Sequence, residues 1–279
     1  MKLLRYGPAG CEQPGLLDCH GNIRSLAGHV SDIAGAALAP EQLDALRQLD
    51  PQKLPLVEGA PRLGPPVAGV GNVIAIGLNY PGHGAQYEIP SEPIIFSKHT
   101  GAICGPNDPI IIPPGASKVD WEVELALVIG QCAKRVSAEA SQKCVAGYML
   151  ANDLSERDFQ SERGGQFIKG KSCENFCPLG PWLVTADEIP DPQAIKLWLD
   201  VNGRRVQDDS TANMIFPVRE LVSYVSQFMV LLPGDVIITG TPPGVGMTRG
   251  WYLRAGDEIE LGGAGLGAQR QRVIDAAES

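Results

Sequence analysis

The sequence predicts an α+β protein that is mainly β. Glycine (33 residues) and proline (23 residues) are frequent in the 279-residue chain, which is typical of many tight turns and short strands. Most apolar segments are short and rich in β-branched residues, whereas few segments show helical spacing. A hydrophobic content of 44% and a charged content of 20% are ordinary for a folded chain with a full core.

Composition also narrows the classes of function. A formal net charge of −9 argues against a nucleic-acid partner or an anionic membrane surface, since both require clustered basic residues. The start, Met1 to Arg5, lacks the apolar core of a signal peptide, and no later segment approaches the ~18 apolar residues of a membrane span. Seven cysteines is an odd number, which favours reduced thiols. We expect a cytoplasmic protein with no membrane partner.

Residues 1–65 are predicted to form a small N-terminal domain. Short strands are expected around 2–6 and 15–18, and a helix is expected near 40–46, where Pro40 suits the first turn. A proline-rich connector then leads to a second domain over 66–279.

The second domain begins with a buried strand over 73–80. Asn202-Gly203 is a hairpin signal, because both residues tolerate the positive φ of a two-residue turn. Pro233-Gly234 marks a turn before another buried strand, and a Gly/Pro-rich loop then presents Thr241. Further strands are expected over 93–98, 120–130, 147–151, 197–201, 204–207, 258–261 and 270–274, and helices over 138–145, 154–162 and 218–229.

The strand 120–130 carries the strongest functional signal. Successive side chains of a strand alternate between its faces, so Glu122 and Glu124 share one face. Two charges roughly 5 Å apart repel by about 3 kcal/mol at an effective dielectric near 20. A divalent cation would relieve this repulsion if a third carboxylate arrived from elsewhere. The alternative is an amphipathic strand that exposes both carboxylates to water.

Asp153 is the best candidate for the third carboxylate. It follows the strand 147–151, and the helix expected over 154–162 would have Ser155 or Asp153 as its cap. On that helix Arg157 and Gln160 would lie on the same face as Asp153. A cation beside a guanidinium group suits an anionic, oxygen-rich substrate such as a 2-keto carboxylate.

Two loops carry further polar residues. The loop after the first strand holds His83, Gln86 and Glu88 among glycines, as expected of a lid with acid/base groups, although a solvated loop remains the alternative. Lys171 lies in a glycine-rich loop that lacks the spacing of a phosphate-binding loop. A lysine directed at the metal site is the functional interpretation.

Five ordered motifs together resemble the fumarylacetoacetate hydrolase family. They are Gly77-Leu78-Asn79-Tyr80 with His83, Trp121 to Leu125, Asn152 to Gln160, Lys169-Gly170-Lys171 and Thr239 to Gly246. The resemblance covers roughly residues 70–275, and many bacterial members carry a short N-terminal domain. It implies a mixed β-roll catalytic domain, a homodimer, and Mg²⁺ or Mn²⁺ bound by Glu122, Glu124 and Asp153. Oxygen ligands suit these hard cations.

The resemblance also implies roles for individual residues. Tyr80, Arg157, Gln160 and Thr241 would bind substrate oxygens, and Lys171 would lie near the developing negative charge. His83 would act as general base on the attacking water. In the family a glutamate three residues later assists this histidine, but this chain has Gln86 there, and Glu88 is the candidate to replace it.

We therefore expect a metal-dependent hydrolase that cleaves a C–C bond of a 2,4-diketo acid. The segment from Glu162 to Val184 looks most like members that convert 2,4-diketo-3-deoxy sugar acids to pyruvate and a hydroxy acid, and like chains labelled ureidoglycolate lyase. The alternatives are decarboxylation of oxaloacetate, or isomerisation or hydration of an unsaturated 2-keto diacid. A catalytically idle metal-binding homologue is the alternative from a different class. The sequence does not choose between Mg²⁺ and Mn²⁺.

Overall fold

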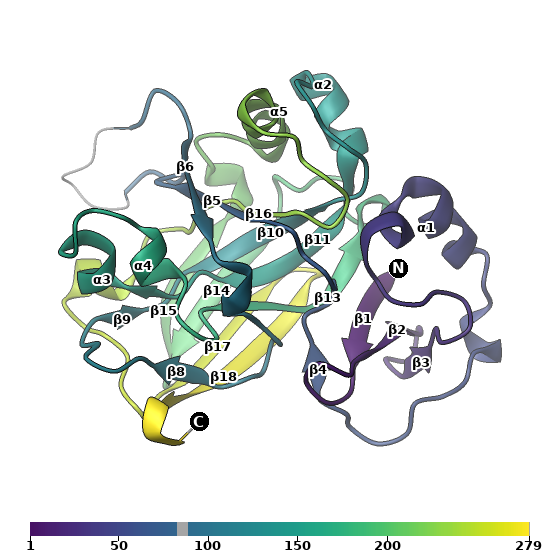
Figure 1. The fold of residues 1–279 in the computed structure, drawn as a ribbon, viewed down its shortest axis with the longest axis horizontal. Helices are drawn as coiled ribbons and strands as arrows, with labels where there is room; N and C mark the ends of the chain where they lie inside the picture. Colours follow the sequence, from purple (N-terminus) through teal and green to yellow (C-terminus); the bar gives the residue numbers. More distant parts are fainter. Residues whose placement is uncertain (83–88, 279) are drawn as a thin grey trace.

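A computed structural model describes residues 1–82 and 89–278. Within these residues the largest element is an 11-stranded mixed sheet with the order β3-β2-β1-β13-β11-β10-β16-β5-β6, to which β4 and β7 add at the side (Figure 1). Its strands are β1 (Lys2–Tyr6), β2 (Gln13–Leu17), β3 (Ile23–Ser25), β4 (Leu63–Gly64), β5 (Val73–Gly77), β6 (Ile94–Lys98), β7 (Ile103–Cys104), β10 (Val123–Ile129), β11 (Val145–Asn152), β13 (Cys177–Thr185) and β16 (Val236–Ile238). The prediction of a mainly β, α+β protein is confirmed.

A second sheet of five strands packs against the first, with β18 against β13 and β14 against β10. It contains β8 (Ile110–Ile112), β14 (Lys196–Val201), β15 (Arg204–Ser210), β17 (Glu258–Gly263) and β18 (Gly267–Asp275). Leu197, Leu199 and Val201 alternate along β14 and are buried, as the period of a strand requires. The predicted hairpin turn is confirmed, because Asn202 and Gly203 have φ values of 51° and 75° between β14 and β15.

The described part of the chain contains few helices, and they lie at the margins of the sheets (Figure 1). They are α1 (Pro40–Arg47), α2 (Ala138–Ser141), α3 (Arg157–Ser161), α4 (Ile168–Lys171), α5 (Val218–Phe228) and α6 (Gly246–Arg249). Helix α5 is amphipathic and packs beside α2. Short 3₁₀ helices occur at Gly35–Leu38, Pro51–Lys53, Thr100–Ala102, Gln142–Cys144, Ala186–Glu188, Thr211–Asn213 and Ala276–Glu278.

The helix predicted over 154–162 was wrong in its first part. Ser155–Glu156 form the short strand β12, which pairs with β9 (Val119–Asp120), and the helix begins only at Arg157. The cap is neither Ser155 nor Asp153, because the carboxylate of Glu156 accepts the backbone N–H of Phe159 at 2.7 Å. Pairing with a distant strand therefore overrides the local capping signal.

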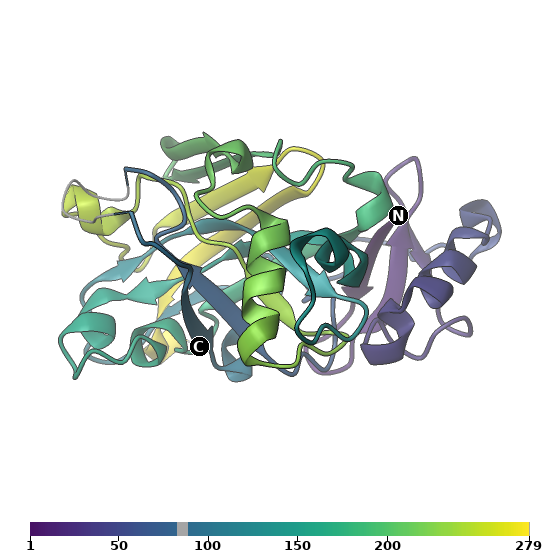
Figure 2. The same ribbon diagram turned by 90° about the horizontal axis from the view of Figure 1, so that it is seen from above.

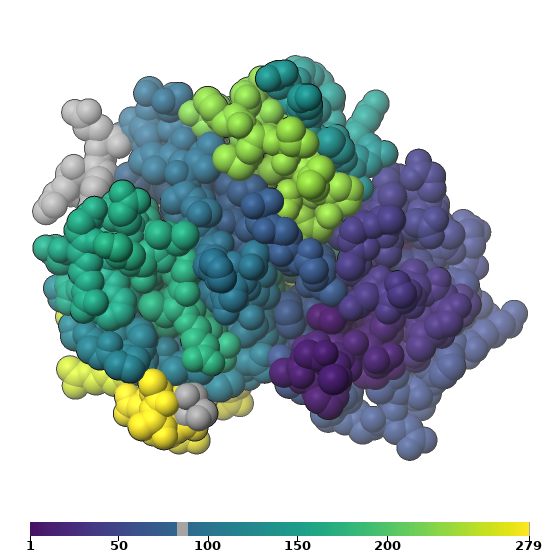
Figure 3. Space-filling view, in the orientation of Figure 1, coloured from purple at the N-terminus to yellow at the C-terminus, as the bar shows by residue number. Residues whose placement is uncertain are grey.

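The N-terminal residues lie at one end of the molecule in both ribbon views and form one side of the space-filling view (Figures 1, 2 and 3). Their strands are not separate from the main sheet, because β1 pairs antiparallel with β13 through Lys2↔Val184 and Leu3↔Leu183. The boundary between 1–65 and 66–279 remains a prediction. None of the helices in the described residues is both long and apolar enough to cross a membrane.

Candidate active site

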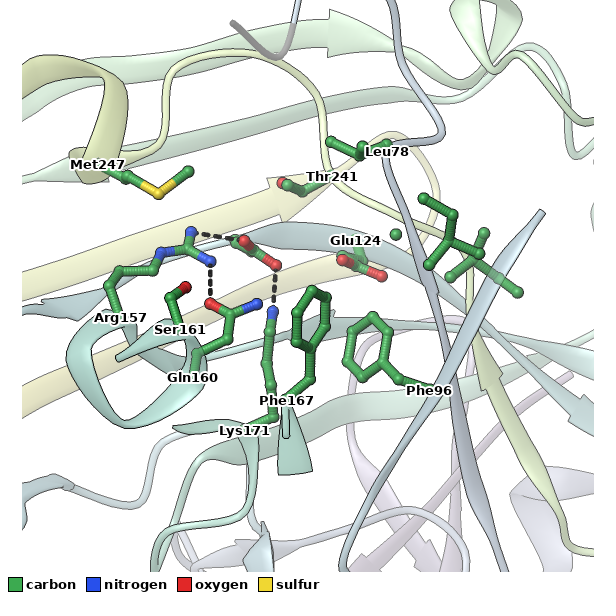
Figure 4. Close-up of a pocket in the computed structure, with 14 residues that line it drawn as sticks. Leu78, Phe96, Glu124, Arg157, Gln160, Ser161, Phe167, Lys171, Thr241 and Met247 are labelled. Atoms are coloured by element: carbon green, nitrogen blue, oxygen red, sulfur yellow. Dashed lines mark hydrogen bonds and ion pairs between the residues drawn. The ribbon is translucent and has the colours of Figure 1, made fainter. Parts of the chain in front are cut away.

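A cavity of about 130 Å³ lies where β5, β6 and β10 meet the segments that carry α3 and α4 (Figure 4). Its polar lining contains six of the residues that the sequence singled out: Glu122, Glu124, Arg157, Gln160, Lys171 and Thr241. These residues come from strands and helices far apart in the sequence, so the fold brings together what the motifs predicted as one site.

Glu122, Glu124 and Asp153 form a compact group of carboxylates. Each offers one oxygen, and these oxygens lie within 4.8 Å of one another. The β10–β11 pairing explains this, because Val123 lies opposite Asn152 and the N–H of Asp153 donates to the carbonyl of Glu122 at 2.9 Å. All three side chains are buried, which excludes the alternative of carboxylates exposed to water.

Two lysines neutralise part of this negative charge. The Nζ of Lys171 lies 2.7 Å from Oε2 of Glu122 and 2.7 Å from Oδ2 of Asp153. Burial lowers the pKa of Lys171, but the neighbouring carboxylates of Asp153 and Glu122 outweigh burial and raise it above its ordinary value. Lys98, which is also buried, donates to Oδ1 of Asp153 at 2.5 Å and to the carbonyl of Leu154 at 3.1 Å.

Glu124 differs from the other two carboxylates. Among the described residues, its carboxylate takes part in one hydrogen bond, from the N–H of Gly240 at 2.7 Å, and in no ion pair. Burial, followed by the charges of Asp153 and Glu122, holds the pKa of Glu124 well above its ordinary value. A buried carboxylate that forms no ion pair with a described residue, beside two further carboxylates, fits a hard divalent cation.

Arg157 is held rigidly at the edge of this group. Its guanidinium contacts Asp120 (Nε, 2.8 Å), Glu122 (Nη2, 2.6 Å) and the amide oxygen of Gln160 (Nη1, 3.0 Å). Its Nη2 also lies 2.7 Å from Asp120 as an ion pair, so the second N–H of Nη1 is the donor that no contact within residues 1–82 and 89–278 engages. Because the oxygen of Gln160 accepts from Arg157, the amide nitrogen of Gln160 is the end available to donate to a ligand.

Thr241 and Tyr80 are placed differently from what their predicted roles suggest. Thr241 lines the cavity, but its hydroxyl donates to the carbonyl of Val123 at 2.9 Å and accepts from Gln207 at 2.8 Å. Tyr80 is buried and is not among the described lining residues. Burial, then Glu124 and Asp209, raises the pKa of its hydroxyl. Their roles in substrate binding remain predictions.

His83, Gln86 and Glu88 lie outside the described residues, so the proposed lid and its acid/base groups also remain predictions.

Sequence reasoning missed Lys98 and Asp120. Lys98 ends an apolar strand, where a lysine side chain ordinarily reaches solvent. The available signal was its spacing, because Lys98 is two residues after Phe96 and therefore lies on the same face of β6. Asp120 directly precedes the Trp-Glu-x-Glu motif, and its oxygens accept the N–H groups of Trp121, Gly246 and Met247 besides binding Arg157. An aspartate at the start of an otherwise apolar strand was the available signal.

Comparison with known proteins agrees with this geometry. A family model described as "Fumarylacetoacetate (FAA) hydrolase C-terminal" matches residues 72–274. A Burkholderia cenocepacia (strain HI2424) protein, named as a candidate hydrolase, is 54% identical over 99% of this chain and 100% of its own length.

Solved structures of similar chains include both hydrolases and isomerases. A probable 2-hydroxyhepta-2,4-diene-1,7-dioate isomerase from Mycobacterium abscessus is 36% identical, with a TM-score of 0.83 over 99% of both chains. The maleylpyruvate hydrolase from Sphingobium sp. SYK-6, in complex with manganese(II) ion and pyruvate, is 28% identical, with a TM-score of 0.82 over 99% of both chains. The chain therefore belongs to the fumarylacetoacetate hydrolase family.

Proposed function

We propose that this protein is a metal-dependent hydrolase that cleaves the C3–C4 bond of a 2,4-diketo acid and releases pyruvate. Water adds its hydroxyl to the C4 carbonyl carbon, and the acyl group R–CO leaves as the carboxylic acid R–COOH. The electron pair of the broken bond stays with C3 of pyruvate, which takes up the remaining proton. The buried group of Glu122, Glu124 and Asp153 beside Arg157, at the wall of a cavity, carries the proposal.

Glu122, Glu124 and Asp153 would hold the cation, which we take to be Mg²⁺ or Mn²⁺. The lack of a cationic partner at Glu124 within the described residues supports this assignment. When bound, the cation would polarise the keto oxygen and stabilise negative charge on it. The manganese and pyruvate in the maleylpyruvate hydrolase support both the choice of metal and the choice of product.

The remaining groups would bind the acid and manage the proton. The second N–H of Nη1 on Arg157, which no described residue engages, and the amide nitrogen of Gln160 suit the substrate carboxylate. Lys171 lies close to the place where negative charge develops, since its ammonium already bridges Glu122 and Asp153. By the family resemblance, His83 would take a proton from the attacking water, with Glu88 as the candidate partner in place of Gln86.

A lactate-dehydrogenase-coupled assay for pyruvate tests the proposal. The protein is given a 2,4-diketo acid and, separately, oxaloacetate, each with Mg²⁺, with Mn²⁺ and with EDTA. Metal-dependent pyruvate release from the diketo acid is expected. Release that persists fully in EDTA, after prior removal of metal, contradicts the metal assignment. A protein inactive on every 2-keto acid would support the idle homologue instead.

The second candidate keeps the cation but does not use water to cleave a C–C bond. The Mycobacterium abscessus structure named as an isomerase is 36% identical to this chain, against 28% for the maleylpyruvate hydrolase, which favours an isomerase or hydratase acting on an unsaturated 2-keto diacid. Pyruvate from oxaloacetate alone would identify a decarboxylase. Loss of the absorbance of an unsaturated keto diacid, without pyruvate, would identify an isomerase or hydratase.

We also propose a homodimer, as the family resemblance implies. Apolar side chains exposed at the end of α5 and just after it support a buried interface there, since Phe228, Val230 and Leu232 are 66%, 46% and 52% exposed. Light scattering coupled to size-exclusion chromatography gives the mass, and a monomer of 29.7 kDa contradicts the proposal.

A further inference from the structure

The cavity has a second wall that contains no charged group. Phe96, Phe167 and Ile94 form this wall beside the carboxylates. In Figure 4 Leu78 lies next to Thr241, across Glu124 from the two rings, and Met247 adds an apolar side chain near Arg157. We propose that the substrate is a 2,4-diketo acid whose acyl group, the part beyond C4, is apolar or aromatic rather than polyhydroxylated. This inference rests on the proposed function and specifies its substrate class.

The wall is built by the pairing of β5 with β6. Ile94 and Phe96 are two residues apart on β6 and therefore share a face, while Gly77 lies opposite Ile94 in the register. A Cβ added at Gly77 would lie 3.5 Å from Cγ2 of Ile94 and 3.7 Å from Cε1 of Phe96. The glycine thus leaves the apolar faces of both neighbours uncovered.

Phe167 completes the wall from the other side. Its ring meets the ring of Phe96 edge to face, with centroids 5.5 Å apart and an interplanar angle of 70°. Phe167 is 38% exposed, so its ring covers Phe96 while part of it remains accessible. An apolar acyl group placed here would cover both rings and exclude water from them.

The apolar wall begins next to the reacting end of the site. The Nζ of Lys171 lies 2.7 Å from Glu122 and Asp153, and the same atom lies 5.2 Å from the centroid of Phe96. Arg157 and Gln160 lie on the other side of the carboxylates in Figure 4. A substrate whose carboxylate binds Arg157 would therefore direct the group beyond C4 towards Phe96.

Hydroxyl groups on that acyl part would find no side-chain partner on the wall that the described residues form. The side chains of Ile94, Phe96, Phe167 and Leu78 neither donate nor accept a hydrogen bond. Of the two hydroxyl side chains that line the cavity, Thr241 already donates to Val123 and accepts from Gln207, and Ser161 lies beside Arg157 and Gln160 in Figure 4. An apolar pocket disfavours one added hydroxyl by roughly 10²-fold in kcat/KM, and a deoxy sugar acid carries more than one.

Pyruvate release from a panel of 2,4-diketo acids tests the inference. The acyl groups are acetyl, butanoyl, benzoyl and the polyhydroxylated acyl group of a 2,4-diketo-3-deoxy sugar acid. We expect kcat/KM for the butanoyl or benzoyl substrate to exceed that for the sugar acid by roughly 10²-fold or more. In Phe167→Ala, the ratio of kcat/KM for the benzoyl substrate to that for the acetyl substrate should fall by roughly 10-fold. Ile168→Ala is the matched control, because Ile168 is adjacent, is 43% exposed and does not line the cavity.

The outcomes separate this inference from the proposed function. Metal-dependent turnover that is fastest with the sugar acid overturns the inference and leaves the hydrolase in place. Equal changes in Phe167→Ala and Ile168→Ala also overturn it. If no diketo acid releases pyruvate, the hydrolase proposal fails, and ligand binding then tests the inference. Benzoylpyruvate is expected to raise the Tm of the Mn²⁺-loaded protein more than the sugar acid does. A larger increase in Tm with the sugar acid overturns the inference.

Discussion

Lys98 and Asp153 form a fully buried ion pair, with the Nζ of Lys98 2.5 Å from Oδ1 of Asp153. Lys171 occupies the other oxygen, Oδ2, at 2.7 Å. One carboxylate of the candidate metal site is thus held by a different lysine at each oxygen. This arrangement fixes the orientation of Asp153 before any cation binds.

Lys98→Met should destabilise the metal-free protein strongly. The change leaves Oδ1 of Asp153 buried without its cationic partner, and breaking such a pair costs about 3–5 kcal/mol of the free energy of unfolding. Urea unfolding measures the loss. Lys118→Met is the control, because Lys118 pairs with Asp158 at 2.7 Å but is 43% exposed, and water and salt screen such a pair so that its loss should change the stability little. Similar losses in both variants would contradict the role of Lys98.

The increase in Tm on adding Mn²⁺ should grow as the pH rises. The folded-state pKa of Glu124 is raised above the unfolded value of about 4.3. Between these two pKa values the native protein binds the extra proton, so the metal-free protein loses stability as pH rises through this window. A bound cation compensates the charge of the ionised carboxylate, so the increase in Tm that the cation produces should grow with pH. Thermal unfolding from pH 5 to 8 with Mn²⁺ and with EDTA checks this. In Glu124→Gln the increase in Tm on adding Mn²⁺ should depend less on pH. An increase in Tm that is the same at every pH in the unaltered protein would contradict the prediction.

Asp120→Asn should weaken substrate binding through Arg157. The substitution removes one of the two carboxylates that pair with the guanidinium, the other being Glu122. It also replaces one acceptor oxygen with an amide N–H₂ group, so a buried N–H donor loses its partner at a cost of about 1–3 kcal/mol. We expect KM for a 2,4-diketo acid to rise more than kcat falls, because Arg157 is proposed to bind the carboxylate in both ground and transition states. Steady-state kinetics measure the changes in KM and kcat separately. Asp200→Asn, at the more exposed Arg205 pair, should leave both constants near their original values.

His83→Ala should reduce hydrolysis of the diketo acid by roughly 10²-fold or more, because the attacking water loses its general base. Decarboxylation of oxaloacetate needs no activated water and should lose less. The coupled pyruvate assay measures both reactions. His29→Ala alters an exposed histidine of the N-terminal segment and serves as the control. Equal losses in the two reactions would argue against His83 as the base.

Part of the stability at neutral pH should depend on Asp18 and should be lost as the pH falls below about 4. Burial raises the pKa of this carboxyl, but hydrogen bonds from Asn22, Arg24 and His20 outweigh burial and hold it well below its ordinary value. A lowered pKa contributes stability above the unfolded value of about 4, and this contribution is lost as pH falls towards the folded value. The difference in Tm between the original protein and Asp18→Asn should therefore be largest near neutral pH and shrink below pH 4. A constant difference would contradict the assignment.

The alternation of strand residues predicted the shared face of Glu122 and Glu124, and the position of Asp153 after a strand predicted the third carboxylate. These inferences succeeded because they depend on local geometry and on one short connection. The start of α3 was wrong because Ser155–Glu156 pair with Val119–Asp120, a long-range contact that local capping signals do not contain.

Lys98 was missed for a similar reason. Its burial depends on a carboxylate 55 positions away, and nothing in the sequence around β6 indicates that partner. The apolar wall was missed because Phe167 and Phe96 meet only when α4 packs against β6. Contacts between distant segments thus set both the electrostatic support of the site and the shape of its cavity.

The pairing of β1 with β13 has a consequence for aggregation. The outer edge of β13 is covered in two pieces, by β7 at Cys177 and Pro178 and by β1 at Leu183 and Val184. A chain shortened to the residues that match the family model would leave Leu183 and Val184 as an open strand edge with unpaired backbone groups. The leading segment therefore covers this edge of β13 and moves the end of the sheet to β3, a strand of only three residues, which offers other molecules a much shorter edge.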